Sequence, residues 1–370
     1  MRFLAHLNEA ERLGHEVWFH GLGLDQEGVD LYGSRFGSRA HFAPYVLTKE
    51  MKPLWRRVLR YVDAGLVGAG LKTPGIDFWF RREWTTQLRQ FAARHAFDCV
   101  VVEYVFFSKA LECFPPDTLK VIDTHDCFSE RGQRARQAGL EHSGMRATAK
   151  TERCGLLRAD RIIAIQDQEA GTFRQMLKDA RPVITVGHWT EFKSLWPPPT
   201  GPWRVGYFGS GYDMNVLAIK WFLRECWPLV KKNFPAAELC IGGGICDLLQ
   251  PSAEVQLTGH VAEPSQFYSS CYLMINPTIV GSGLKIKNIE ALGYGMPLVT
   301  TSIGAEGLNE GANKAFMVAD DGPSFAGAVV KILSNPIMAQ NLSDAALQFC
   351  EEYNARQRKA FARVVSKEPN

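Results

Sequence analysis

Several features of disulfide-linked, membrane-spanning and nucleic-acid-binding proteins are missing from the sequence. Its nine cysteines contain no Cys-x-x-Cys pair and no Cys/His grouping at zinc spacing, which is typical of a reducing compartment. The apolar runs, such as 99–102 and 104–107, are far too short to span a bilayer, and residues 1–20 lack the apolar core of a signal peptide. The 42 Lys and Arg against 39 Asp and Glu leave a net charge of +3, much smaller than a dedicated nucleic-acid binder usually carries. We therefore expect a cytoplasmic globular protein with no nucleic-acid partner.

Short apolar runs alternate with longer amphipathic stretches along the whole chain. The apolar runs are rich in Val, Ile and Phe, and their near-continuous apolar character is typical of parallel strands that are buried on both faces. Expected strands include 15–20, 98–103, 119–123, 203–208 and 273–276, and expected helices include 215–232 and 284–294. This alternation predicts an α/β fold.

A proline-rich segment divides the chain. Residues 196–202 read Trp-Pro-Pro-Pro-Thr-Gly-Pro, which continues neither a helix nor a central strand. A length of 370 residues is typical of two domains. We expect two Rossmann-like domains, 1–195 and 203–349, that face each other across a cleft.

The start of the chain differs from that of an ordinary doubly wound domain, which opens with a strand and a glycine-rich turn. Here a helical pattern over 3–13 comes first, and an expected strand at 15–20 follows it. We therefore expect the first strand of the N-terminal domain to be missing from this sequence, through truncation or a misassigned start.

One stretch combines a strand, a glycine turn and a helix start. Gly281 and Gly283 let the backbone approach a ligand, and the helix start directs free N–H groups and a positive dipole at it. Lys285 and Lys287 lie where an ammonium reaches phosphate oxygens, and Glu290 lies where a carboxylate accepts the hydroxyls of a ribose. The alternative is an ordinary strand-to-helix turn with surface lysines.

The same stretch resembles the donor-site segment of the group 1 (family 4) glycosyltransferases, which are GT-B enzymes that use sugar nucleotides. Residues 281–290 match a Gly-Ser-Gly-x-Lys-x-Lys-x-x-Glu version of that segment, with Glu290 as the retained glutamate. Ser282 stands where the commoner version has a first glutamate. The resemblance implies that the Ser282 hydroxyl or a backbone N–H near Leu284 replaces it.

The resemblance extends to other loops of the C-terminal half. It implies that Gly209 and Ser210, after the strand 203–208, face the cleft beneath the donor phosphates. It also implies that Gly259 and His260 lie beside the base of the nucleotide, with His260 as a loop residue rather than a catalyst.

In the N-terminal half, polar residues follow the expected strand that ends at Asp123. Ligands of open α/β sheets bind outside the carboxyl ends of strands, which places His125 near a reacting sugar. The alternative is a histidine that only caps the next helix. The segment resembles the family's Thr-His-Asp turn, so we expect His125 and Asp126 to be catalytic. Glu103, after the preceding strand, and Arg131 are expected on the acceptor side, where a solvated arginine is the alternative.

The resemblance implies a retaining glycosyltransferase that needs no metal and no other cofactor. Its C-terminal domain binds a nucleoside diphosphate sugar, and its N-terminal domain binds a glycan or lipid-linked acceptor for polysaccharide assembly. It also implies that a C-terminal helix, about 350–370, packs back on the N-terminal domain. Two alternatives stay open, namely a sugar-nucleotide-binding protein that has lost transferase activity and a GT-B-like sugar-nucleotide epimerase.

A basic amphipathic stretch at 51–62 carries a further expectation. Lysine and arginine alternate there with leucine, valine and aromatic residues. Such a helix rests on an anionic membrane surface, which predicts peripheral contact with the inner face of the membrane. The alternative is a packed helix with a solvated basic face.

Overall fold

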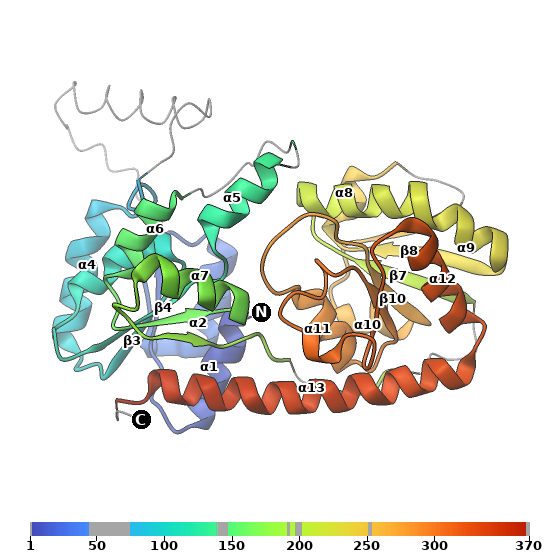
Figure 1. Cartoon of the computed structure of the whole chain (residues 1–370). Helices are drawn as coiled ribbons and strands as arrows, with labels where there is room; N and C mark the ends of the chain where they lie inside the picture. Colours follow the sequence, from blue (N-terminus) through green and yellow to red (C-terminus); the bar gives the residue numbers. More distant parts are fainter. Residues whose placement is uncertain are drawn as a thin grey trace.

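A computed structural model of the chain describes residues 2–43, 75–137, 139, 147–190, 193–196, 202–250 and 254–367. These residues form two α/β halves that lie side by side and share one long C-terminal helix (Figure 1). The expected basic helix at 51–62 and most of the proline-rich segment, 197–201, lie outside the described residues.

The C-terminal half is built on one parallel six-stranded sheet. Its strand order is β12-β11-β10-β7-β8-β9, from β7 (Trp203–Phe208), β8 (Ala237–Gly242), β9 (Val255–Gly259), β10 (Leu273–Asn276), β11 (Leu298–Thr300) and β12 (Met317–Val318). The chain order therefore reverses between β7 and β10, which are neighbours in the sheet. In open α/β sheets, ligands bind at the carboxyl ends of strands at such a reversal. The two strands that meet there precede two of the expected donor loops.

Helices cover both faces of this sheet and complete one continuous core. They are α8 (Asp213–Trp221), α9 (Trp227–Asn233), α10 (Pro264–Ser269), α11 (Ile286–Gly293) and α12 (Gly322–Leu333). The expected helix over 215–232 is present, but a π-helical turn, Phe222–Cys226, joins α8 to α9 within it. Strand residues such as Val205, Tyr207 and Val299 are buried, as the near-continuous apolar runs predict.

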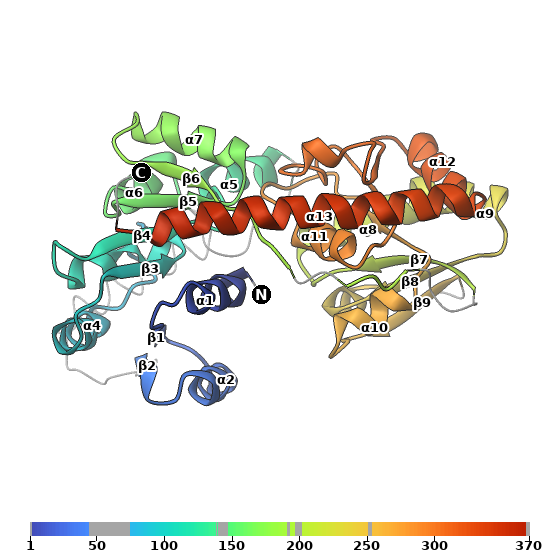
Figure 2. The ribbon, with the colours of Figure 1, turned by 90° about the horizontal axis from the view of Figure 1, so that it is seen from below.

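The N-terminal half contains two separate parallel sheets. One has four strands in chain order, β3 (Cys99–Glu103), β4 (Leu119–Asp123), β5 (Arg161–Ala164) and β6 (Val183–Thr185). The other pairs β1 (Phe19–Leu22) with β2 (Ala40–Ala43), and Figure 2 shows this pair with α2 set apart from β3 and β4. The helices of this half are α1 (Arg2–Arg12), α2 (Gln26–Phe36), α4 (Arg82–Arg94), α5 (Phe128–Gln137), α6 (Ala149–Leu156) and α7 (Asp167–Leu177).

The expected strand at 15–20 was placed too early. Gly14 has a φ of +85°, which ends the preceding helical turn, and residues 15–18 run on without a strand partner. Pairing starts only at Phe19, which lies opposite Ala40. The apolar pattern marked the strand, but its partner decides where the strand begins.

The helix α13 (Pro336–Val365) runs along both halves (Figure 2). Its 30 residues give a length of about 45 Å. Ala339 and Ala346 belong to the core of the C-terminal half, whereas Phe361 and Val364 pack with residues of the four-stranded sheet. This helix therefore ties the two halves together.

Candidate functional site

The glycine turn after β10 has the backbone that the sequence predicts. Gly281 has a φ of +148° and Gly283 a φ of +76°, conformations that residues with a side chain rarely adopt. The helix α11 begins at Ile286, two residues later than expected, with Lys285 at its N-cap. The turn therefore leads directly into a helix N-terminus, a position at which an anion is stabilised.

Two half-buried lysines lie at the start of the helix next to this turn. The Lys285 ammonium donates to the carbonyls of Gly283 at 2.5 Å and Ser282 at 3.3 Å. The Lys287 ammonium donates to the Tyr207 hydroxyl at 3.1 Å and to Asn215 Oδ1 at 3.0 Å. Burial, with Lys285 nearby, lowers the pKa of Lys287 to about 7, and burial also lowers the pKa of Lys285. An anion in front of α11 would favour the charged form of both groups.

Glu290 lies on the second turn of α11, as expected. Its carboxylate accepts a hydrogen bond from the Tyr268 hydroxyl at 3.2 Å, and the residue is 9% exposed. Burial raises the pKa of Glu290. A ligand hydroxyl that donates to this carboxylate would favour its ionised form.

A buried amide network, which the sequence analysis missed, fixes the loop on the sheet. The Asn276 amide donates to Asn288 Oδ1 at 2.9 Å, and the Asn288 amide donates to the carbonyl of Gly304 at 2.8 Å. Thr300 Oγ1 donates to the carbonyl of Asn276 at 2.9 Å. Buried networks of this kind hold a rigid geometry when all members are paired. The available signal in the sequence was a polar residue at the carboxyl end of each of two apolar strands, Asn276 in β10 and Thr300 in β11.

The loop after β7 joins the lysine site through one asparagine. The Asn215 amide nitrogen donates to the carbonyl and hydroxyl oxygens of Ser210 at 2.9 and 3.2 Å, while its oxygen accepts from Lys287. Gly209 packs closely, because a Cβ on Gly243 would stand 2.4 Å from its carbonyl oxygen. The structure thus brings the predicted Ser210 and Lys287 together.

Gly259 and His260 follow β9 at the far edge of the same sheet. Gly259 accepts a backbone hydrogen bond from Gly243 at 2.8 Å. His260 is exposed, and within the described residues no hydrogen bond or ion pair joins it to the glycine turn. These two residues share the carboxyl end of the sheet with the lysines but stand apart from them.

His125 lies at the carboxyl end of β4 in a strained backbone. It has a φ of +61°, and its ring stacks on Tyr104, itself at +66°, with centroids 4.1 Å apart. Its Nε2 forms a short hydrogen bond with the Glu103 carboxylate and lies 3.9 Å from the Asp123 carboxylate. Burial opposes the charged imidazole, but Asp123 and Glu103 outweigh it and raise the pKa of His125. Glu103, expected on the acceptor side, therefore holds His125.

Asp123 anchors this group to the start of the chain. The Arg2 guanidinium binds both of its oxygens, at 2.9 and 3.0 Å. Burial opposes ionisation of Asp123, but Arg2 and His125 hold its pKa well below the usual range. His6, Glu103 and Asp123 are close enough to offer three metal ligands, yet Arg2 and His125 already pair with the two carboxylates. We assign no ion to this group.

Asp126 connects the two halves of the predicted site. It accepts a hydrogen bond from Ser282 Oγ at 2.9 Å, although the two residues are 156 positions apart. Arg131 lies 3.3 Å from the Asp126 carboxylate, at the same junction. Burial raises the pKa of Asp126, and Arg131 counteracts this.

A second contact between the halves involves residues that the sequence analysis missed. The Arg134 guanidinium donates to the carbonyl of Gly281 and to the Glu306 carboxylate, both at 2.8 Å. Glu306 also lies 3.5 Å from the Lys285 ammonium. The glycine turn is therefore contacted from both domains. The one signal in the sequence was an arginine one helical turn after Arg131.

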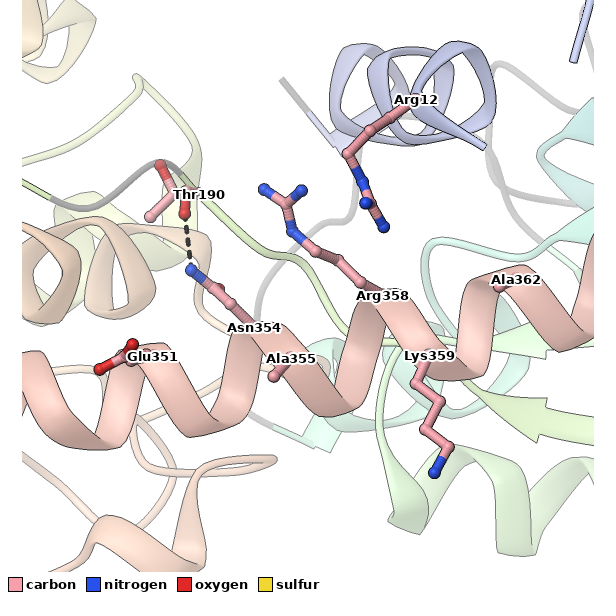
Figure 3. Close-up of a pocket in the computed structure, with 8 residues that line it drawn as sticks. All are labelled: Arg12, Thr190, Glu351, Asn354, Ala355, Arg358, Lys359 and Ala362. Carbon is pink, nitrogen blue, oxygen red and sulfur yellow. Dashed lines mark hydrogen bonds between the residues drawn. The ribbon is translucent and has the colours of Figure 1, made fainter. Parts of the chain in front are cut away.

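A groove elsewhere in the molecule is separate from this site. It has a volume of about 740 Å³ and lies between α1 and α13, with no candidate site residue in its lining (Figure 3). Arg12 and Arg358 border it, and both pair with the buried carboxylate of Glu9. The Glu9 carboxylate therefore neutralises part of the positive charge of this groove.

The C-terminal half matches a known family. Residues 202–335 match the family model described as glycosyl transferases group 1, and this range holds the glycine turn, both lysines and Glu290. The C-terminal domain is therefore similar to the group 1 glycosyltransferases. An uncharacterized 44.6 kDa protein of the cps region of Klebsiella pneumoniae is 27% identical to the chain over 162 residues. The match covers 40% of this chain and 42% of that protein, so the chain spans less than half of its length.

Solved glycosyltransferase structures show the same fold. Anabaena HepE in complex with UDP matches with a TM-score of 0.62 and 13% identity, over 95% of this chain and all of that chain (100%). A UDP-forming α,α-trehalose-phosphate synthase from Burkholderia xenovorans matches with a TM-score of 0.64 and 11% identity, over 95% and 99% of the two chains. Staphylococcus aureus TarM matches with a TM-score of 0.59 and 13% identity, over 76% and 59%. The expected GT-B fold is confirmed.

A search of the described helices for bilayer-spanning segments finds none of sufficient length and apolarity.

Proposed function

We propose that this glycosyltransferase moves a sugar from a nucleoside diphosphate sugar to a glycan or lipid-linked acceptor. The proposal rests above all on one arrangement, in which two half-buried lysines of one domain flank a glycine turn whose Ser282 is hydrogen-bonded to Asp126 of the other domain. HepE, which shares the fold, was solved in complexes with UDP and with UDP-glucose, and this favours a uridine nucleotide.

The donor diphosphate binds between the glycine turn and the start of α11. Lys287 is paired with neutral oxygens in the described structure, so an anion supplies the charge that it lacks. Glu290, one turn further along the helix, accepts the ribose hydroxyls. Along the helix, the lysines that bind the phosphates therefore come first, and the glutamate that binds the ribose follows them.

Transfer takes place where the two domains meet. The diphosphate leaving group gains negative charge as the glycosidic bond breaks, and preorganised positive groups stabilise that charge. Lys285, Lys287 and the N-terminus of α11 supply this stabilisation, so no metal is needed. His125, whose pKa is raised by Asp123 and Glu103, donates a hydrogen bond to the transferring sugar or to the departing phosphate. Retention of configuration is part of the proposal and rests on the resemblance of residues 281–290.

Polysaccharide assembly at the inner face of the membrane fits these chemistries. The relative from the Klebsiella cps region supports a role in making a surface polysaccharide. A lipid-linked acceptor would place the N-terminal domain at the membrane surface, where the basic residues of 51–62 bind anionic lipid.

The experiment has two stages. A thermal-shift screen of nucleoside diphosphates and their sugars should reveal at least one that raises the melting temperature, since a ligand of the native state stabilises it. The best donor is then incubated with and without membrane glycolipid acceptors, and free nucleotide and new product are measured. Acceptor-dependent release supports transfer. Binding without release points to a binding protein, and conversion of the sugar without acceptor points to an epimerase.

A further inference from the structure

The first turn of α7 carries hydrogen-bond acceptors that have no donor. Gln166, at the N-cap of α7, is 3% exposed, and Glu169 is 2% exposed. Among the described residues, neither Gln166 Oε1 nor either carboxylate oxygen of Glu169 has a hydrogen-bond partner. Buried polar atoms are nearly always paired in native proteins, so this group requires an explanation.

Both side chains face loops of the C-terminal domain. Glu169 Oε1 lies 3.3 Å from the point where a Cβ on Gly283 would stand, and Asp126 Oδ1 lies 3.8 Å from that point. Gln166 Oε1 lies 2.9 Å from the corresponding point on Gly307. Glu169 therefore borders the glycine turn at Gly283, and Gln166 borders the neighbouring loop at Gly307.

The chemistry of these atoms selects their ligand. Burial and the neighbouring Asp126 carboxylate raise the pKa of Glu169 well above its ordinary value. A phosphate offers only further acceptors, whereas a hydroxyl group both donates and accepts and so pairs with this carboxyl group and with Gln166 Oε1. Phosphate oxygens thus fit the lysine side of the turn, and a polyhydroxylated group fits the α7 side.

We propose that Glu169 and Gln166 accept hydrogen bonds from hydroxyl groups of the transferred sugar and so select the sugar of the donor. This inference rests on the proposed function, because it places the sugar next to the diphosphate in front of α11. The contacts of Asp126 with Ser282 and of Arg134 with Gly281 close this region, so the sugar enters with the domains apart.

The test separates recognition of the sugar from recognition of the nucleotide. The wild-type protein, Glu169→Gln, Glu169→Met and the exposed control Glu351→Met are titrated calorimetrically with UDP, GDP and ADP and with their glucose, galactose and mannose conjugates. UDP-N-acetylglucosamine completes the panel. For the best-binding pair, Glu169→Met should raise the ratio of the Kd of the sugar nucleotide to that of the free nucleotide about tenfold. The Kd of the free nucleotide should stay within about twofold, and Glu169→Gln should show an intermediate ratio.

A second readout distinguishes a binding role from a structural one. Because the carboxyl group is buried without a donor, Glu169→Met should raise the melting temperature of the free protein, whereas loss of a structural glutamate would lower it. Two outcomes overturn this inference alone. One is an unchanged ratio of the two Kd values in Glu169→Met. The other is a lower melting temperature together with an equal loss of affinity for the sugar nucleotide and the free nucleotide. Failure of every nucleotide to bind the wild-type protein overturns the proposed function and the inference with it.

Discussion

The two domains differ in how well their buried groups are satisfied. In the N-terminal domain, His20, His188 and Glu169 are among the described residues with a buried polar atom that lacks a hydrogen-bond partner. In the C-terminal sheet domain, Trp227 has such an atom. The described non-glycine residues with positive φ follow the same division. Four of them belong to the N-terminal domain, and Asn313 belongs to the C-terminal one.

The cores differ in the same direction. One continuous cluster fills the C-terminal domain, while the apolar residues of the N-terminal domain fall into three clusters around two sheets. Strained and unpaired groups persist where the surrounding fold or a ligand compensates for them. The comparison therefore fits the proposal that the C-terminal domain holds a preformed nucleotide site and the N-terminal domain holds the reacting groups. Variants in the two domains should then fail in different ways.

The largest effect should follow loss of His125. Asparagine tolerates a positive φ, so His125→Asn removes the imidazole and keeps the backbone at +61°. Turnover should fall about 100- to 1,000-fold, while the Kd of the donor changes less than about twofold, because the group acts mainly in the transition state. Steady-state kinetics and calorimetry on the same preparations check this. Lys178→Asn is the matched control, since Lys178 has a φ of +53° outside the site. Full turnover in His125→Asn would show that the histidine is structural.

Loss of Glu290 should do the reverse. Glu290→Ala removes the acceptor of the ribose hydroxyls and should weaken binding of the nucleoside diphosphate by about 1–3 kcal/mol. Turnover at saturating donor should change much less than in His125→Asn. Calorimetric titration measures the loss, and Glu351→Ala, an exposed glutamate on α13, serves as the control. Unchanged nucleotide affinity in Glu290→Ala would remove the ribose from this position.

The donor turn could be predicted because its parts are contiguous. Gly281, Gly283, Lys285 and Lys287 follow one strand and start one helix, so their juxtaposition needs no tertiary information. The position of Glu290 on the same helix could be predicted for the same reason, and its role toward the ribose stays a prediction.

The partners that are distant in sequence could not be predicted in the same way. The pairing of Arg2 with Asp123 spans 121 positions, and that of Arg134 with Glu306 spans 172. Such pairs depend on how two sheets and two domains are placed, which no local pattern encodes. Gln166 and Glu169 were missed for the same reason, because in the sequence they begin an ordinary helix.

The pH dependence of donor binding tests the charge on Lys287. Burial lowers the pKa of this ammonium to about 7 in the free protein, so it loses its proton as the pH rises through 7. Diphosphate binding favours the charged form, and above pH 7 the Kd should therefore rise, approaching about tenfold per pH unit. A sugar nucleotide is the right probe, because its diphosphate is fully ionised across this range. Lys287→Arg keeps the charge and should flatten the profile between pH 7 and 9. A wild-type profile that is already flat would contradict the role of Lys287.

The smallest effect concerns the contact between the domains. Arg134→Ala removes hydrogen bonds to Gly281 and Glu306 that help to hold the domains closed, and exposed or half-exposed pairs of this kind contribute about 0–1 kcal/mol each. The free variant should therefore populate an open form about two- to fivefold more than the wild type, within the limits set by α13.

Energy transfer between dyes on the exposed Cys154 and on a cysteine introduced as Lys331→Cys measures the separation of the domains. Arg224→Ala, which breaks a pair with its neighbour Glu225 inside the C-terminal domain, should leave the distance unchanged. Saturating sugar nucleotide should bring Arg134→Ala back toward the wild-type distance, since the ligand itself bridges the domains. Equal distances in the free wild type and in free Arg134→Ala would mean that α13 alone sets the width of the cleft.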